Sequence, residues 1–193
     1  MSLLNRIIIL LRGKNVAVLG PRVAGKSTLY SLLTTGEASA DAEQTIGPTR
    51  VRGARNKNLG LTISKGVDLP GHDRAYPDWE KQFVKASLVF YVFDAHKART
   101  QPDYASRIEQ DGRKMKEWGL SAKRKIVLLG THADKDPLFE ALTPAEYSDL
   151  ILDLDVIAAL HGRVRVAACE VGSIRATREG TALLGRLLQA LAS

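Results

Sequence analysis

The chain has 193 residues, of which 28 are Lys or Arg and 21 are Asp or Glu, so its formal net charge is +7. This length favours one domain, and a content of 45% hydrophobic and 25% charged residues is that of a globular protein. The single cysteine, Cys169, excludes an internal disulfide, and no Cys/His cluster has the spacing of a structural zinc site. We therefore expect a reducing, cytoplasmic location.

Positive charge is concentrated in the first third of the chain. Residues 1–36 contain five basic and no acidic residues, and residues 45–67 contain another five with no acid. Such charge favours a surface for phosphate, for an acidic partner or for an anionic membrane, or it offsets the charge of a bound polyphosphate. We expect no nucleic-acid partner.

Residues 1–13 are expected to form an amphipathic segment ahead of a domain over 14–193. At 100° per residue, most apolar residues of 2–12 fall on one side of a helix, and Arg6 and Arg12 fall on the other. The segment lacks the features of a signal peptide and is too short to span a bilayer. It is expected either to dock on this protein or a partner, or to make a weak peripheral contact with a membrane.

The first half of the chain opens with a strand, a loop and a helix. The apolar run over 15–19 ends in glycine and predicts a buried strand, which a Gly-rich loop connects to a helix over about 26–34. Residues 36–48 have no periodicity and predict a long functional loop. Two runs over 49–55 and 59–68 then predict a β-hairpin.

Helices and buried strands alternate in the second half of the chain. Helices are expected over 79–87, 101–119, about 143–160 and 178–191, and strands over 88–94, 125–130 and 163–168. This alternation predicts an α/β fold, with a mostly parallel six-stranded sheet, one antiparallel edge hairpin and helices on both faces. Ligands of such folds bind at the carboxyl ends of the strands.

A phosphate-binding motif lies at the end of the first expected strand. The segment fits G-x-x-x-x-G-K-[ST] between a strand and a helix, which is the context that identifies a P-loop. Loop N–H groups would face the phosphates, Lys26 would place a cation at the outer phosphates, and the Ser27 hydroxyl would coordinate Mg²⁺. The expected nucleotide-binding residues here are Gly20, Pro21, Arg22, Val23, Ala24, Gly25, Lys26, Ser27 and Thr28.

Polar residues also follow the later strands. Asp68 offers a carboxylate to water-ligated Mg²⁺, and Gly71 offers an N–H to a γ-phosphate. Asp134 can accept two N–H bonds from guanine, which adenine cannot donate, and it lies in a segment that begins with Thr131 and His132. The last strand is expected to end next to three more site residues, Ala168, Cys169 and Glu170.

Together these motifs resemble the Ras/Arf type of small GTPase over nearly the whole chain. The resemblance implies that Thr45, rather than Thr49, is the switch I threonine, and that Mg²⁺ is held by Ser27 and Thr45 directly and by Asp68 through water. It also implies that GTP and GDP are the ligands, and that loops 36–48 and 71–79 contact an effector or regulatory protein. Among these proteins, the Thr-Ile-Gly sequence around Thr45 is most similar to Arf.

Two residues bear on hydrolysis. His72 follows the D-x-x-G motif, where Ras-like proteins have the glutamine that orients the attacking water, so His72 is the expected catalytic residue, with a surface histidine as the alternative. Arg22 either blocks or replaces an arginine supplied by a partner, or points to solvent. Without another arginine near Thr45, hydrolysis is expected to be slow.

The expected function is that of a small GTP-binding protein, a molecular switch with slow Mg²⁺-dependent GTP hydrolysis. The alternative is a pseudo-GTPase that keeps its nucleotide as a structural or interaction subunit, because His132 and the Ala168–Glu170 segment depart from the usual base-binding motifs. A P-loop kinase or ATPase is disfavoured by the order of Asp68, the hairpin and Asp134.

Overall fold

The computed structural model describes residues 15–38, 49–51, 54–56, 61–63, 66–119 and 124–192. The expected amphipathic segment over 1–13 lies outside these residues. So does most of the expected loop over 36–48, including Thr45.

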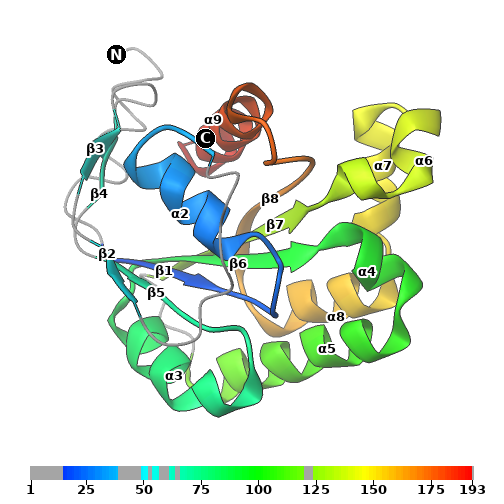
Figure 1. Ribbon diagram of the computed structural model, residues 1–193. Helices are drawn as coiled ribbons and strands as arrows, with labels where there is room; N and C mark the ends of the chain where they lie inside the picture. The colour runs from blue at the N-terminus through cyan, green and yellow to red at the C-terminus, as the bar shows by residue number, and fades with distance from the viewer. Residues whose placement is uncertain are drawn as a thin grey trace.

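A mostly parallel sheet forms the middle layer of the molecule (Figure 1). In the described part of the chain its strand order is β2-β5-β1-β6-β7-β8, and all neighbours are parallel except β2, which is antiparallel to β5. The expected α/β domain with a parallel sheet is therefore confirmed. The parallel strands are β1 (Val16–Leu19), β5 (Gly66–Asp68), β6 (Leu88–Asp94), β7 (Lys125–Thr131) and β8 (Val166–Val171).

The expected edge hairpin over 49–55 and 59–68 is described in two antiparallel parts, because residues 52, 53, 64 and 65 lie outside the described residues. β2 (Thr49–Val51) pairs with β5 in the main sheet, whereas β3 (Ala54–Asn56) and β4 (Leu61–Ile63) pair as a separate two-stranded sheet.

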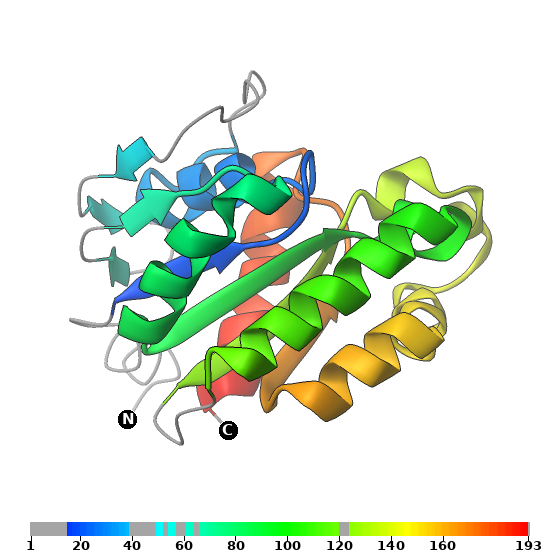
Figure 2. The same cartoon turned by 90° about the horizontal axis from the view of Figure 1, so that it is seen from below.

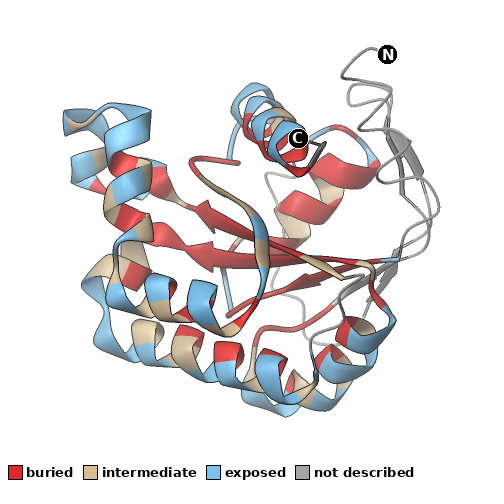
Figure 3. Cartoon of the chain, turned by 180° about the vertical axis from the view of Figure 1, so that it is seen from behind, coloured by how far each residue is buried: buried red, intermediate tan, exposed pale blue. Residues whose placement is uncertain are grey.

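Helices cover both faces of the sheet, as Figures 1 and 2 show. One face packs against α2 (Lys26–Thr34) and α9 (Thr177–Ala192), and the other packs against α3 (Tyr76–Lys85), α5 (Pro102–Glu117) and α8 (Asp155–Arg163). Both interfaces are apolar, and the central strands β1, β6 and β7 between them are almost wholly buried (Figure 3). Burial of these side chains is the main stabilising contribution to the fold.

Short helices shape the edge of the sheet at which the strands end. They are η1 (Asp73–Ala75), α4 (Ala95–Thr100), η2 (Ala133–Lys135), α6 (Pro137–Ala141) and α7 (Pro144–Leu152). Of these, α7 was expected from its cap: Thr143 and Glu146 form a capping box at its N-terminus. No helix in the described ranges combines the length and apolar character needed to cross a bilayer.

The strand β6 lies at the centre of the sheet, between β1 and β7, and all seven of its residues are buried. Its last residue, Asp94, is in register with Thr131, the last residue of β7. Both strands therefore deliver polar residues to the same edge, beside the loop that follows β1. This edge is the candidate functional site.

Candidate functional site

Close backbone packing fixes the loop between β1 and α2. Gly20 has φ 142°, and a Cβ atom at this position would lie 1.9 Å from the carbonyl oxygen of Val92. Gly25, the residue before α2, has φ 84°. Both positions require glycine, because other residues rarely adopt these φ angles. At Gly20, the close approach to Val92 also leaves no space for a side chain.

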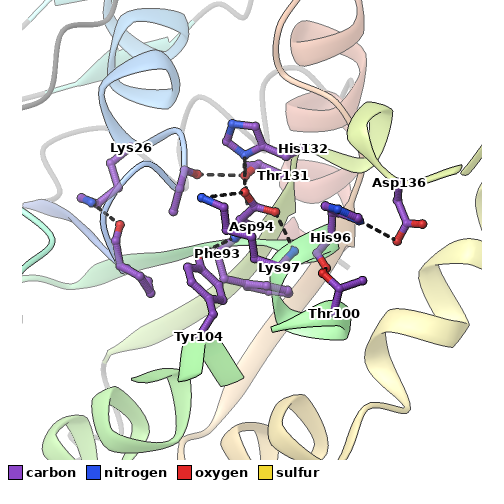
Figure 4. Close-up of polar contacts among 12 residues, drawn as sticks. Lys26, Phe93, Asp94, His96, Lys97, Thr100, Tyr104, Thr131, His132 and Asp136 are labelled. Atoms are coloured by element: carbon purple, nitrogen blue, oxygen red, sulfur yellow. Dashed lines mark hydrogen bonds and ion pairs between the residues drawn. The ribbon is translucent and has the colours of Figure 1, made fainter. Parts of the chain in front are cut away.

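Lys26 begins α2 and is only 6% exposed. Its Nζ donates a hydrogen bond of 2.6 Å to the carbonyl oxygen of Pro21, so the ammonium group folds back along the loop (Figure 4). No acidic residue lies in the first turn of α2, and its N-cap residue, Gly25, has no side chain to form a cap. The positive end of the helix dipole and a cation therefore face the same loop, while Ser27 and Thr28 lie in the first turn.

The outer part of the same loop is exposed and strained. Val23 has φ 58° and is 58% exposed. A β-branched residue in this left-handed conformation costs on the order of 1–3 kcal/mol, and such strain is found mostly at functional sites. Arg22 beside it is also exposed.

Thr131 joins the end of β7 to the glycine-rich loop. Its buried hydroxyl lies 2.9 Å from the carbonyl oxygen of Ala24 and 3.1 Å from that of Phe93 (Figure 4). The Nδ1 atom of His132 lies 2.9 Å from the same hydroxyl oxygen. The carbonyl oxygens can only accept, so the Thr131 hydroxyl donates its hydrogen bond to them. The hydroxyl oxygen then accepts a hydrogen bond from Nδ1–H of His132.

His132 has φ 56°, which turns the chain into η2. Burial lowers the pKa of its imidazole, although Asp94, whose carboxylate is 3.7 Å from Nδ1, acts in the opposite direction. The imidazole is therefore neutral near pH 7. Two residues further on, Asp134 is exposed on η2, and its carboxylate is available to a ligand.

A buried ion pair anchors the segment that carries Asp134. The carboxylate of Asp136 accepts two hydrogen bonds from Arg99 of α4, at 2.8 and 2.7 Å, one from Tyr147 at 3.1 Å and one from the backbone N–H of Leu138. The hydrogen bonds from Arg99 are the largest cause that lowers the pKa of Asp136 to about 2.

We expect Asp136→Asn to lower the free energy of unfolding by about 2 kcal/mol at pH 7, because the folded state favours the ionised carboxylate. This contribution is complete above the ordinary pKa of 3.8 and is lost as the pH falls toward 2. Urea unfolding of the wild type and of Asp136→Asn from pH 7 to pH 3 measures this contribution. Asp149→Asn, at an exposed position, is the control. A difference between Asp136→Asn and the wild type that stays constant over this range would contradict the assignment.

The loop after β5 packs directly on the glycine-rich loop. A Cβ atom at Gly71 would lie 2.4 Å from both the N atom of Arg22 and the carbonyl carbon of Pro21. Two adjacent cavities, of about 370 and 500 Å³, share the lining residues Arg22, Gly71 and Arg107. The larger is also lined by His72. Asp68 ends β5, in register with Val18 of β1.

The expected loop over 71–79 is largely helical. Residues from Asp73 onward form η1 and then α3, and Trp79 is fully buried, with its Nε1 donating to the carbonyl oxygen of Pro70 at 2.9 Å. The helix was expected to begin at Trp79, but Tyr76-Pro77 already provides the first turn, since proline is well suited to that position.

The expected end of the last strand at Ala168 is wrong. β8 runs to Val171, so the residues from Ala168 to Glu170 lie within the strand and not in a loop after it. Glu170 pairs with Arg186 of α9 at 3.0 Å, and burial raises the pKa of the Cys169 thiol to about 12. The strand end was predicted too early because the charged, half-buried Glu170 interrupts the apolar run.

The segment that does follow β8 begins at Gly172 and was missed. The Gly172 N–H donates to the carbonyl oxygen of Gly130 at 2.9 Å, and the Arg175 N–H donates to Ser173 Oγ at 3.3 Å. Ile174 is buried, and its side chain packs at Gly25 of the first loop. The Gly172-Ser173 pair is a turn signal that could have located this segment.

Comparison with known proteins agrees with this arrangement. The family described as 50S ribosome-binding GTPase matches residues 15–132, which is more than half of the chain. The chain therefore belongs to this family of P-loop GTPases. No curated protein matched in the sequence search.

Three solved structures share the fold at low sequence identity. The Arl6 BBS3 small GTPase from Trypanosoma brucei with bound GppNp has a TM-score of 0.62 at 16% identity, covering 92% of this chain and 95% of that one. The mammalian SRP receptor has a TM-score of 0.60 at 16% identity, with 89% and 98% covered. The GDP complex of the small COPII coat GTPase SAR1 from Encephalitozoon cuniculi has a TM-score of 0.56 at 17% identity, with 98% and 83% covered.

Proposed function

We propose that this protein binds GTP and GDP with Mg²⁺ and acts as a molecular switch that hydrolyses GTP slowly. The observation that carries the proposal is the hydrogen bond between Thr131 and the carbonyl oxygen of Ala24. It joins the loop with the properties of a phosphate site to the segment that presents the exposed Asp134. A nucleotide requires both, because its phosphates would bind at the loop and its base at Asp134.

The phosphates are proposed to occupy the glycine-rich loop. Its backbone N–H groups and the N-terminus of α2 favour an anion, and the ammonium group of Lys26 can exchange its bond to Pro21 for a phosphate oxygen.

The residues proposed for Mg²⁺ fit that ion chemically. Ser27, Thr45 and Asp68 offer hydroxyl and carboxylate oxygens, the hard donors that Mg²⁺ prefers, with Asp68 acting through water. Ser27 lies in the first turn of α2, next to Lys26. When bound, the ion would neutralise charge on the outer phosphates.

The guanine base is proposed to be recognised by Asp134. His132 stands where the related proteins have lysine, and as a neutral ring it can cover the base by stacking. The segment Gly172–Arg175 is proposed in place of Ala168, Cys169 and Glu170 as the last part of the base site, because it follows β8 and Ile174 packs at Gly25 of the glycine-rich loop. The exposed Asp134 side chain is the group on which discrimination against adenine depends.

We expect His72→Ala to slow single-turnover GTP hydrolysis by about tenfold or more without weakening GTP binding, because His72 is proposed to orient the attacking water. His72 lines the cavity beside Arg22 and Gly71, which supports this role. Hydrolysis is measured by rapid-quench assays, with His161→Ala on the exposed side of α8 as the control. An unchanged rate would make His72 an ordinary surface residue.

Switching and permanent nucleotide binding are separated by one experiment. A switch releases GDP in exchange for GTP and hydrolyses the new nucleotide, and its partners are proposed to contact residues 36–48 and 71–79. A pseudo-GTPase subunit retains its nucleotide without turnover. Release of a fluorescent GDP analogue, followed by a single-turnover assay on the same sample, distinguishes these functions.

The N-terminal residues 2–12 are proposed to dock on protein, with weak membrane contact as the alternative. Arg6, Arg12 and Lys14 would add about 1 kcal/mol each at an anionic surface. We expect that neither the GDP nor the GTP form co-sediments with vesicles of anionic lipid, and that deletion of residues 2–12 lowers stability. Sedimentation of either form would instead support peripheral membrane association.

A further inference from the structure

Arg107, on α5, contacts the segment that follows Gly71 at several points. Its Nη1 forms an ion pair with Asp73 of η1, and its Nε donates to Asp111 at 2.8 Å. The guanidinium group also lies over the ring of Tyr76, at 4.9 Å from the centroid, and at 5.8 Å from that of Trp79. Flat cations over aromatic rings are attracted by the ring electrons.

The acceptor below Arg107 is a fully buried carboxylate. Asp111 accepts hydrogen bonds from Tyr76 at 2.7 Å and from Tyr91 of β6 at 2.9 Å. Burial raises the pKa of Asp111, and the nearby charge of Arg107 is the largest cause that opposes it. A buried charge needs a partner, so the buried carboxylate of Asp111 fixes the position of the Arg107 guanidinium group.

These contacts extend to the glycine-rich loop. The ring of Trp79 is tied to the carbonyl oxygen of Pro70, the residue before Gly71, and Gly71 packs against the backbone of Arg22. Arg107 also lines both cavities beside Gly71. One side chain on α5 is therefore connected, through η1 and α3, to the backbone next to the proposed γ-phosphate position.

We propose that Arg107 is a positioning residue that clamps the segment over 71–79 against α5 and so holds Gly71 and His72 beside the glycine-rich loop, even without a γ-phosphate. The proposal rests on the proposed function for its consequence, which is that hydrolysis depends on the clamp. The clamp itself is a property of the protein with or without nucleotide.

Amide hydrogen exchange tests the clamp directly on the nucleotide-free and GDP-loaded full chain. Asp73 is 65% exposed, so Asp73→Asn removes the outer ion pair without disturbing the core. We expect exchange over residues 72–79 to be about threefold faster in this variant. The double variant Arg107→Gln/Asp111→Asn, which leaves no buried charge unpaired, should raise it by about tenfold or more.

The matched control is Arg113→Gln, which removes the ion pair between Arg113 and Glu109 on the same helix. Exchange over 72–79 should be unchanged in the control, and exchange over β6 should be unchanged in Asp73→Asn. Equal protection of 72–79 in all variants would overturn the clamp. Equally faster exchange over β6 and over 72–79 would also overturn it, because Arg107 would then serve only global stability.

Single-turnover hydrolysis tests the consequence. Asp73→Asn and the double variant should both slow hydrolysis, the double variant by the larger factor, with GTP affinity within about twofold of the wild type. An unchanged rate in a variant with a loosened segment would overturn the positioning role. If the wild type binds no GTP, the proposed function fails, whereas hydrogen exchange in the nucleotide-free chain still decides the clamp.

Discussion

Lys26→Ala should abolish measurable binding of GTP and GDP, a loss of about a hundredfold or more. The ammonium group is the one buried cation among the described residues of the glycine-rich loop, and a charge-assisted bond from it to the phosphates is among the strongest single contacts a nucleotide can form. The substitution places alanine, a good helix former, at the first position of α2, so the fold should be preserved.

Binding is measured by calorimetric titration, and circular dichroism verifies the fold. Lys81→Ala on α3, where the lysine is 67% exposed, is the control for loss of one positive charge and should bind normally. Retention of wild-type affinity by Lys26→Ala would mean that the ligand does not occupy this loop.

Asp134→Ala is expected to lower GTP and GDP affinity by about a hundredfold, because two hydrogen bonds to a charged acceptor are lost together. Asp134 is exposed and outside the core, so the variant should be as stable as the wild type. Adenine nucleotides, which gain nothing from Asp134, should bind both proteins equally weakly.

Glu140→Ala provides the matched control, since Glu140 is an exposed acid on α6, a few residues from Asp134. It should bind both nucleotides as the wild type does. If Asp134→Ala also binds GTP normally, base recognition lies elsewhere, even if the phosphate assignment holds.

The central part of the fold could be predicted because its sequence signals are local. β6 was predicted at its observed bounds, Leu88–Asp94, since a strand buried on both faces forms a continuous apolar run. The helix over Lys26–Thr34 was likewise predicted at its observed bounds, because the glycine-rich loop marks its start.

Features that depend on distant contacts could not be predicted in the same way. The α4 helix has six residues and is capped by Asp94, a residue interpreted only as the end of a strand. Its role is clear only from the Arg99–Asp136 pair, which joins residues 37 positions apart. The contact of Arg107 with Asp73 is also between elements distant in the sequence, so neither residue was singled out.

The end of β8 could not be predicted from residue polarity. Glu170 lies within a strand at the border of the sheet, where it pairs with Arg186, and such half-exposed positions tolerate charge. Polarity alone therefore placed the strand end before Cys169, and the segment at Gly172 was overlooked. The packing of Ile174 at Gly25 is visible only in three dimensions.

The edge of the sheet that bears the glycine-rich loop and Asp134 is proposed to select a guanine nucleotide. Calorimetric titration of the wild-type chain with GDP and with ADP, both in the presence of Mg²⁺, tests it most directly. We expect GDP to bind at least about a hundredfold more tightly than ADP, corresponding to about 3 kcal/mol. Equal affinity for the two nucleotides, or no binding of either, would contradict the claim.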